Sequence, residues 1–472
     1  MEQIIKWLRK NGYKTPDNDY YKVIAGWKSW YEGNVKNFHN YSIFNGKKEV
    51  KKQRKTLQMA KSVCESMANL LMNEKVRICL DDTRTQEFID DVFKKNNFRV
   101  KMNEFQELKS AVGTVAYVPY GDDIIYDKNS GALSEGDIKI NFVEAENIYP
   151  LSWHNGVIDE CAFAINHTVG DKDYVHLQIH THAKSGYVTE NKFFKIGHGS
   201  MSEISAADIT EFKSIANRIE TKSHRKTFVI DRLAVANNFY TGSPFGVSLY
   251  ANAISILQGI DLAYDSLCNE FTLGRKRIFV RPEMLSFDSE VSGFDSNTTE
   301  FYMLPEDNGD GDLIKEVNME LRVDNHREAI QTNLDLLSGK IGFGKGYYSY
   351  SKDRAGAVTA TQVVSENSEL FRTIKKHEII LEDVIKELVG LISDIGVRYL
   401  GKTVDSETNI SIDFDDSIIE DKQAEFNRDL MLVNAGAMGV DELRARYMNE
   451  SIEEARKNLP GQEVSQEESD EE

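Results

Sequence analysis

The sequence predicts an α+β protein in which helices and strands occupy separate stretches of the chain. Helix-type apolar spacing dominates residues 1–110, and long helical patterns return from 243 to 398. Between them, from about 113 to 231, short β-branched and aromatic runs alternate with Gly, Asn and Asp. At 472 residues and 40% hydrophobic content, the chain is long enough for two to four domains with real cores.

The charge balance limits how this protein can meet nucleic acid. Lysine and arginine number 57 against 76 acidic residues, which gives a net charge of −19. A protein that neutralises phosphates usually carries the opposite sign. Any contact with DNA is therefore expected to be local.

The cysteines and the apolar runs point to a soluble protein made in a cytoplasm. We expect no signal peptide, because the first ten residues form an amphipathic helix start. We also expect no membrane span, because no apolar run approaches about 18 residues. The cysteines match no metal or disulfide spacing and are expected to be small buried residues in a reducing compartment: Cys64, Cys79, Cys161 and Cys268.

The first 110 residues are expected to be mostly helical, with one helix near 56–73 that follows a basic run. Its apolar face comprises Leu57, Ala60, Val63, Met67 and Leu70. The run is interpreted as solvated surface, with a nucleic-acid site as the weaker alternative: Lys47, Lys48, Lys51, Lys52, Arg54 and Lys55.

The central stretch predicts an antiparallel sheet. Strands are expected at 115–120, 138–143, 161–168, 174–181, 187–194 and 227–230. His176, His180 and His182 fall on one face of a strand. No carboxylate or cysteine accompanies them, so a polar sheet face is favoured over zinc.

The stretch from 243 to 398 predicts a helix, a short β-rich insert, and two further helices. Ser243 and Pro244 predict the start of a helix of roughly 28 residues that ends at Gly274. Its seam is Tyr250, Ala253, Leu257, Ile260, Tyr264, Leu267 and Phe271.

The insert is expected to hold strands at 278–281, 301–304 and 313–317. A second helix should start at Asn325, with Ile330, Leu334, Leu337 and Ile341 as its apolar stripe. The longest helix should run from Thr359 to Arg398, with Leu381, Ile385, Leu388, Ile392 and Ile395 on its buried side. A strand at 409–414, two short helices and an acidic tail are expected beyond residue 401.

No supported catalytic site is found in the sequence. Residues 339–346 match a phosphate-binding loop except at the last position, where Gly346 replaces the hydroxyl that holds magnesium. That loop also follows a helix rather than a strand. Residues 306–312 resemble a calcium loop in composition only, and a solvated turn is favoured there. We therefore expect no cofactor, no metal and no enzymatic activity.

A basic and aromatic loop is the strongest candidate for contact with DNA. Basic groups meet phosphates, aromatic rings offer planar faces and glycines let the backbone move. A surface loop with chance aromatics stays open as an alternative. The candidates are Lys340, Phe343, Lys345, Tyr347, Tyr348, Tyr350, Lys352 and Arg354.

Over nearly its whole length the chain resembles the portal proteins of tailed bacteriophages, in the branch common in phages of Gram-positive bacteria. Four features carry the resemblance, each weak alone but in a specific order. They are residues 241–246 (TGSPFG), residues 359–368 (TATQVVSENS) after the glycine-rich loop, residues 414–421 (FDDSIIED), and the closing segments 432–436 (LVNAG), 441–444 (DELR) and 453–455 (EEA).

The resemblance implies a set of named parts within each subunit. A wing would comprise residues 1–240 together with the long helix at 358–400, and a stem would comprise the helices 243–274 and 323–341. A clip would span 275–322, a tunnel loop 342–357, and a crown 401–460, followed by a disordered acidic tail at 461–472. The clip and stem would offer Arg275, Lys276, Arg277 and Arg281 for docking.

The resemblance also implies partners. They are further copies of this chain in a ring, typically of twelve, and double-stranded DNA passing non-specifically through the channel. The large terminase subunit, the major capsid and scaffold proteins and the head-completion or adaptor proteins complete the set. The ring would be assembled in the bacterial host cytoplasm and reside at one capsid vertex of the virion. Two alternatives stay open: an ATP- or metal-dependent DNA-processing enzyme using the Lys345 loop, and a capsid or tail adaptor without DNA contact.

Overall fold

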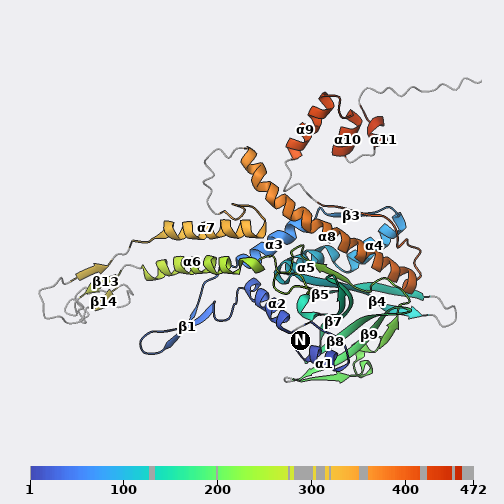
Figure 1. Cartoon of the computed structure of the whole chain (residues 1–472), viewed down its shortest axis with the longest axis horizontal. Coiled ribbons are helices and arrows are strands. Elements are labelled where there is room, and N and C mark those ends of the chain that lie inside the picture. The colour runs from blue at the N-terminus through green and yellow to red at the C-terminus, as the bar shows by residue number, and fades with distance from the viewer. Residues whose placement is uncertain are drawn as a thin grey trace, which may run out of the picture. The chain divides into compact units, whose positions relative to one another are not determined.

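The computed structural model describes residues 2–16, 18–126, 133–197, 200–274, 277–280, 301–303, 314–317, 320–349, 360–414, 422–448 and 452–459. The chain divides into two compact units, Met1–Phe414 and Asp415–Glu472. Helices and sheets both occur, so the α+β class is confirmed (Figure 1).

The helices of the first unit surround and extend from its sheets. Among its described residues they are α1 (Glu2–Lys10), α2 (Asn18–Tyr31), α3 (Met59–Leu71), α4 (Thr83–Lys95), α5 (Phe98–Val112), α6 (Ile254–Leu273), α7 (Val323–Ile341) and α8 (Ala360–Leu400).

The largest sheet is antiparallel, with the order β10-β9-β8-β7-β6 and with β11 also paired to β9. The six strands that the sequence predicted in this stretch are confirmed, but only β7, β8 and β9 belong to this sheet; the other three form a second sheet, so the prediction of one sheet is wrong. Three strands of the large sheet were missed: β6, β10 and β11. The bounds of the sheet are β6 (Ile148–His154), β7 (Val157–Val169), β8 (Lys172–Ala183), β9 (Gly186–Gly197), β10 (Ser200–Ile204) and β11 (Arg218–Glu220).

A second sheet joins three strands in the order β12-β4-β5 and packs against helices. Its strands are β4 (Thr114–Tyr126), β5 (Leu133–Glu144) and β12 (Val229–Arg232). Helices α5 and α8 contact it, and the predicted stripe of α8 from Leu381 to Ile395 is buried. The strand β16 (Ile410–Asp413) follows α8 and pairs with β3 (Arg77–Leu80).

A buried ion pair links α5 to this second sheet. Lys109 Nζ lies 2.9 Å from Asp231 Oδ1, and both side chains are almost completely shielded from solvent. The other carboxylate oxygen of Asp231 accepts hydrogen bonds from Gln106 Nε2 at 2.7 Å and from the Tyr117 hydroxyl at 3.1 Å. Because a buried charge is stable only when it is paired, this network fixes where α5 sits on the sheet.

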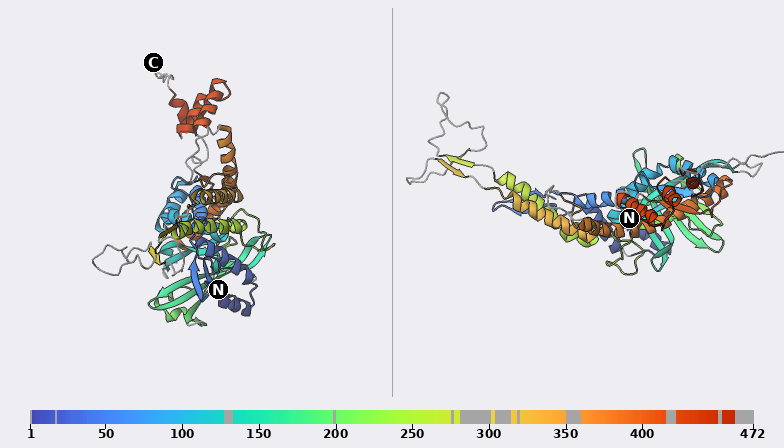
Figure 2. Two further views of the ribbon diagram at one scale, coloured as in Figure 1. Left: turned by 90° about the vertical axis from the view of Figure 1, so that its left-hand side faces the viewer. Right: turned by 90° about the horizontal axis from the view of Figure 1, so that it is seen from above.

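The helices α6 and α7 form an antiparallel pair that extends away from the sheets (Figures 1 and 2). A Cβ atom on Gly259 of α6 would lie 2.8 Å from Asn333 Oδ1 of α7, so the two helices approach closely there. Beyond them, β13 (Arg277–Val280) pairs in parallel with β14 (Phe301–Met303) and antiparallel with β15 (Ile314–Val317). The predicted β insert is therefore confirmed in its strands.

The predicted start of α6 is wrong. The helix begins at Ile254, and residues 243–250 form a buried connecting segment. The backbone of this segment bonds to other elements: Gly246 N donates to Thr114 Oγ1 at 2.7 Å, and Tyr20 donates to the Gly246 carbonyl at 2.6 Å. A Cβ on Gly246 would lie 2.2 Å from the Gly113 carbonyl oxygen. Ser243 and Pro244 predicted a helix start, but the backbone groups that follow them are satisfied by hydrogen bonds to distant segments and not by helical hydrogen bonds.

The outer half of the predicted α6 seam is also less buried than expected. Leu257 and Ile260 are fully buried, but Phe271 is half exposed. The stripe of α7 from Ile330 to Ile341 is buried as predicted. The pair therefore holds together at its base, while its far end leaves apolar surface uncovered.

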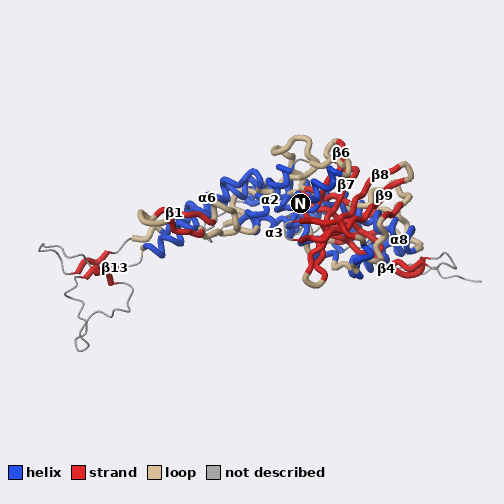
Figure 3. The backbone as a smooth tube through the Cα atoms, turned by 90° about the horizontal axis from the view of Figure 1, so that it is seen from below, coloured by secondary structure: helices blue, strands red, loops and turns tan. Residues whose placement is uncertain are grey.

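The expectation of a mostly helical first stretch missed a β-hairpin. Strands β1 (Asn40–Phe44) and β2 (Glu49–Gln53) pair with each other (Figure 3). Of the basic run, Lys51 and Lys52 lie in β2 and Lys47 and Lys48 lie in the turn between the strands. Helix α3 replaces the predicted helix near 56–73, and its apolar positions from Ala60 to Leu70 are buried as expected.

The second unit contains α9 (Lys422–Asn434), α10 (Val440–Met448) and α11 (Ile452–Lys457). Asp429 is buried and accepts from Arg446 Nη1 at 2.9 Å and from the Tyr447 hydroxyl at 3.0 Å. This contact joins α9 to α10. The acidic tail at 461–472 lies outside the described residues.

Candidate nucleic-acid interface

The loop after α7 starts from a tightly built turn. Gly342 ends the helix in the left-handed conformation with φ 83°, and Phe343 N donates to the Ser338 carbonyl at 2.9 Å. A Cβ on Gly342 would lie 2.4 Å from Thr373 Oγ1 of α8. Both the positive φ and the contact with α8 require glycine here, so this end of the loop is fixed in place.

The aromatic residues of the loop pack on one another. The Phe343 ring centroid lies 4.7 Å from that of Tyr347, which in turn lies 4.9 Å from that of Tyr348. The Tyr348 hydroxyl donates to Ser66 Oγ of α3 at 3.0 Å, and Gln331 Nε2 of α7 donates to the Tyr348 carbonyl at 3.1 Å. Residues 343–348 are therefore clamped between α3 and α7.

This packing corrects the role predicted for Phe343. Its side chain is only 2% exposed, so the ring stabilises the loop instead of offering a face to DNA. Tyr347 is 39% exposed and keeps one side open. Burial raises the pKa of the Tyr347 hydroxyl, which stays protonated at neutral pH.

The two described lysines of the candidate set are open to solvent. Lys340 lies in the last turn of α7 and Lys345 lies in the loop, and both are exposed. Among the described residues neither ammonium forms an ion pair. Their charges are thus available to an external anion. The other predicted members of the loop lie outside the described residues: Tyr350, Lys352 and Arg354.

Of the predicted docking residues only Arg277 is described. It begins β13, opposite Val317 of β15. Arg275, Lys276 and Arg281 lie outside the described residues, so their grouping with Arg277 stays a prediction.

Sequence reasoning missed a polar clasp at the far end of the helix pair. Arg322 Nε and Nη2 donate to the two carboxylate oxygens of Glu270, at 3.1 and 2.9 Å, and the Arg322 backbone N–H also donates to Glu270. These hydrogen bonds lower the pKa of Glu270 to about 2. Bidentate Arg–carboxylate contacts are common, but these two residues lie 52 positions apart, so no local sequence pattern indicates that they pair.

Two histidines on β8, His176 and His180, are hydrogen-bonded to neighbouring polar side chains. His176 is buried and its Nε2 lies 2.8 Å from Asn191 Oδ1, while His180 Nδ1 lies 2.7 Å from Thr227 Oγ1. Burial lowers the pKa of His176 to about 4 and that of His180 to about 3, so both rings are neutral at physiological pH. No group of potential metal ligands occurs within the described ranges. The alternative of a zinc site thus gains no support. The polar sheet face favoured from the sequence is present, but His176 and His180 on it are buried and not exposed to solvent.

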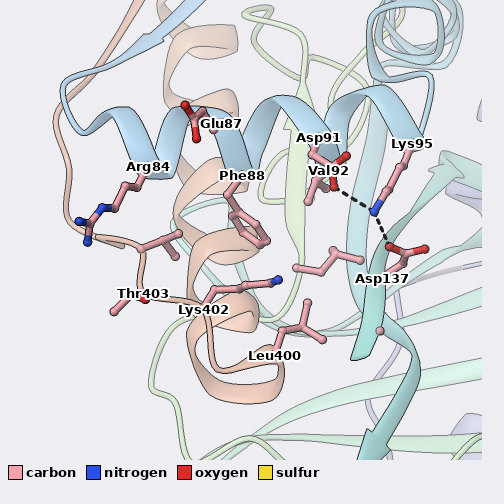
Figure 4. Close-up of a pocket in the computed structure, with 13 residues that line it drawn as sticks. Arg84, Glu87, Phe88, Asp91, Val92, Lys95, Asp137, Leu400, Lys402 and Thr403 are labelled. Carbon is pink, nitrogen blue, oxygen red and sulfur yellow. Dashed lines mark hydrogen bonds and ion pairs between the residues drawn. The ribbon is translucent and has the colours of Figure 1, made fainter. Parts of the chain in front are cut away.

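A pocket of about 370 Å³ lies between α4, β5 and the end of α8 (Figure 4). Phe88, Val92 and Leu400 line it, and Lys95 Nζ lies 2.9 Å from Asp91 Oδ2 and 2.8 Å from Asp137 Oδ1. Arg84 and Lys402 add two cations to the lining and Glu87 adds one acid, so the three positive and three negative side chains cancel and this pocket has no net attraction for an anion.

Comparison with known protein families gives a match over nearly the whole chain. A family model described as phage portal protein, SPP1 Gp6-like, matches residues 12–459. Curated proteins include no match to the chain. In the part of the chain that the structure describes, every helix is too short or too polar to cross a membrane.

Proposed function

Because this chain belongs to the SPP1 Gp6-like family of phage portal proteins, we propose that it forms a ring, typically of twelve subunits, at one capsid vertex. The family is structural and not enzymatic. In this proposal the ring is the channel for DNA packaging and ejection. It also docks the large terminase subunit and, later, the head-completion or tail-connector proteins.

The observation that carries the proposal is the projecting pair α6–α7 with its terminal three-stranded sheet. A slender helical pair tipped by a small β module suits a repeated channel wall better than an enzyme cleft. The half-exposed Phe271 and the exposed Leu262 and Leu336 leave apolar surface on the pair that a neighbouring subunit would cover. In this assignment α6 and α7 are the stem, and the segment from Arg277 to Val317 belongs to the clip.

The loop after α7 is assigned to the channel. Its clamped base holds Lys340 and Lys345 exposed at a fixed position, and a ring would repeat them at one level. The net charge of −19 favours a channel that repels DNA overall, so that the polymer slides. The lysines, together with Tyr350, Lys352 and Arg354, would then act as a local friction point on the phosphates.

The assignment of the remaining parts follows the same proposal. The sheets with α1 to α5 and α8 form the wing, and the unit from Asp415 onward belongs to the crown, which begins at residue 401. Capsid and scaffold proteins are the expected neighbours during assembly in the host cytoplasm, and the mature virion is the final location.

Electron microscopy of the purified full-length protein tests the ring. Rings with a central pore are expected, and a stable monomer at high concentration, also in the presence of capsid components, would contradict the proposal. Lys340→Glu with Lys345→Glu tests the loop. The rings should persist while DNA packaging or retention changes, and Lys184→Glu with Lys213→Glu is the matched control on exposed lysines of the sheet region.

The same preparations separate the alternatives. Measurable ATP hydrolysis or DNA cleavage that Lys345→Ala abolishes would favour a DNA-processing enzyme. If Lys340→Glu with Lys345→Glu leaves both the rings and DNA packaging unchanged, an adaptor without DNA contact would be favoured.

A further inference from the structure

The β1–β2 hairpin is an arm with exposed faces. In each five-residue strand only the second residue, Tyr41 or Val50, is partly buried. Ile43 is 47% and Phe44 is 65% exposed. A two-stranded hairpin is only marginally stable in water by itself, so this surface calls for a further packing partner. Figure 1 shows the hairpin beside α6, on the side of that helix opposite α7.

The base of the hairpin is held rigidly. The Arg54 guanidinium lies over the rings of Phe38 and Tyr41, at 4.2 and 4.9 Å from their centroids. His39 Nε2 lies 2.9 Å from Asp261 Oδ2, and Lys55 N donates to Asp265 Oδ1 at 2.9 Å.

Both of those aspartates belong to α6 and are buried. The hairpin is therefore fixed to α6 through buried carboxylates, and it keeps one direction relative to the helix pair.

One face of the hairpin combines apolar side chains with Lys52, and the Arg54 guanidinium lies over its Tyr41 ring. The register places Tyr41 opposite Lys52 and Ile43 opposite Val50, so these four side chains share a face. A partner for this face should be apolar with an accessible acid.

The outer side of α7 offers one exposed leucine and one exposed acid. Asn325, Glu328, Thr332 and Leu336 are all exposed, and their spacing of 3, 4 and 4 keeps them on one side of the helix. Leu336 is 56% exposed. The stripe of twelve residues from Asn325 to Leu336 is about 18 Å long by helical rise, and a five-residue strand is about 17 Å long.

We propose that the β1–β2 hairpin of one subunit packs on the outer side of α7 of a second copy of this chain. Ile43 and Val50 would cover Leu336, and Lys52 would approach Glu328. The inference rests on the proposed ring. A ring needs a contact between two different surfaces of the same chain, and the arm and the stripe are two such surfaces.

Cross-linking between differently substituted copies tests the contact directly. In a Cys79→Ser, Cys268→Ser background, full-length Ile43→Cys protein is mixed with Leu336→Cys protein, assembled, and treated with a short bismaleimide. A cross-linked dimer is expected, several-fold more abundant than with Val157→Cys, an exposed position on β7, in place of Ile43→Cys. A yield equal to that control in preparations that contain rings overturns the inference and leaves the ring standing. If the unsubstituted protein forms no rings, both the ring and this contact are overturned.

Charge reversal provides a second measurement. Lys52→Glu should raise the subunit concentration needed for half-assembly about two- to fivefold, as an exposed ion pair allows, and adding Glu328→Lys should restore it. Lys213→Glu, at an exposed position away from the hairpin, should have no effect. If Lys52→Glu leaves assembly unchanged but weakens DNA retention, the hairpin meets nucleic acid, and the proposed contact between copies is wrong.

Discussion

The buried pair of Lys109 and Asp231 allows a sharp test of how the body of the subunit is held together. We consider Lys109→Met, which keeps the length of the side chain and removes its charge. Asp231 would keep two neutral donors, Gln106 and Tyr117, but lose its counter-charge.

At 2.9 Å and an effective dielectric constant near 20, the direct attraction is about 6 kcal/mol before the desolvation of both charges is subtracted. Removing one partner of such a buried pair costs about 3–5 kcal/mol of unfolding free energy. Replacing both, as Lys109→Met with Asp231→Leu, should cost less than either single change, because no unpaired charge then remains.

Urea unfolding followed by tryptophan fluorescence measures this. The four tryptophans, Trp7, Trp27, Trp30 and Trp153, all lie in the first unit, so the signal reports on that unit alone. Lys28→Met, at a half-buried lysine on α2 that pairs with Glu144 and Glu146, is the control and should cost clearly less. If Lys109→Met cost no more than Lys28→Met, or if the double replacement cost the sum of the two singles, the argument from buried charge would fail.

Three further changes test the helix pair and the loop. Gly342→Ala should destabilise the subunit by about 1–3 kcal/mol in the same urea assay, because of its positive φ and the approach of Thr373; an unchanged midpoint would contradict that. Leu334→Ala should cost about 2–5 kcal/mol by removing a fully buried side chain from the stripe of α7, with Ile379→Ala, at an exposed position on α8, as a nearly silent control. The pKa of Glu270 is lowered to about 2. Its contact with Arg322 therefore stabilises the far end of the helix pair at pH values above about 4.3, the pKa of an unfolded glutamate, and this stabilisation is lost as the pH falls through about 2. Protease cleavage between α6 and α7 should therefore increase over that pH window in the native protein but not in Glu270→Gln; equal pH profiles would refute the clasp.

Much of the secondary structure could be predicted from the sequence because its signals are local. The stripe of α7, the buried side of α8 and the strands of the large sheet follow from periodicity within single elements. The start of α6 could not be predicted this way. Ser243 and Pro244 are good helix-start residues, yet Thr114, Tyr20 and Ser110 take the hydrogen bonds of the segment that follows.

The properties of the candidate loop are also only partly predictable from the sequence. Its basic and aromatic composition is visible in the sequence, and in the structure Lys340 and Lys345 are exposed. That Phe343 is buried, and that Tyr348 is tied to Ser66, depends on α3, which lies almost three hundred residues earlier in the chain. No local pattern carries that information.

The sequence by itself determined the α+β class, the helix pair with its β insert and the family resemblance, because each depends on the order and periodicity of neighbouring residues. Only the tertiary structure decided which charges are paired and buried, which aromatic rings are buried, and that four of the six basic residues from Lys47 to Lys55 lie on a projecting hairpin. Those features arise where distant segments meet, as Lys109 meets Asp231 and Glu270 meets Arg322. Desolvation and hydrogen bonding across such contacts depend on three-dimensional proximity, which composition and spacing do not encode.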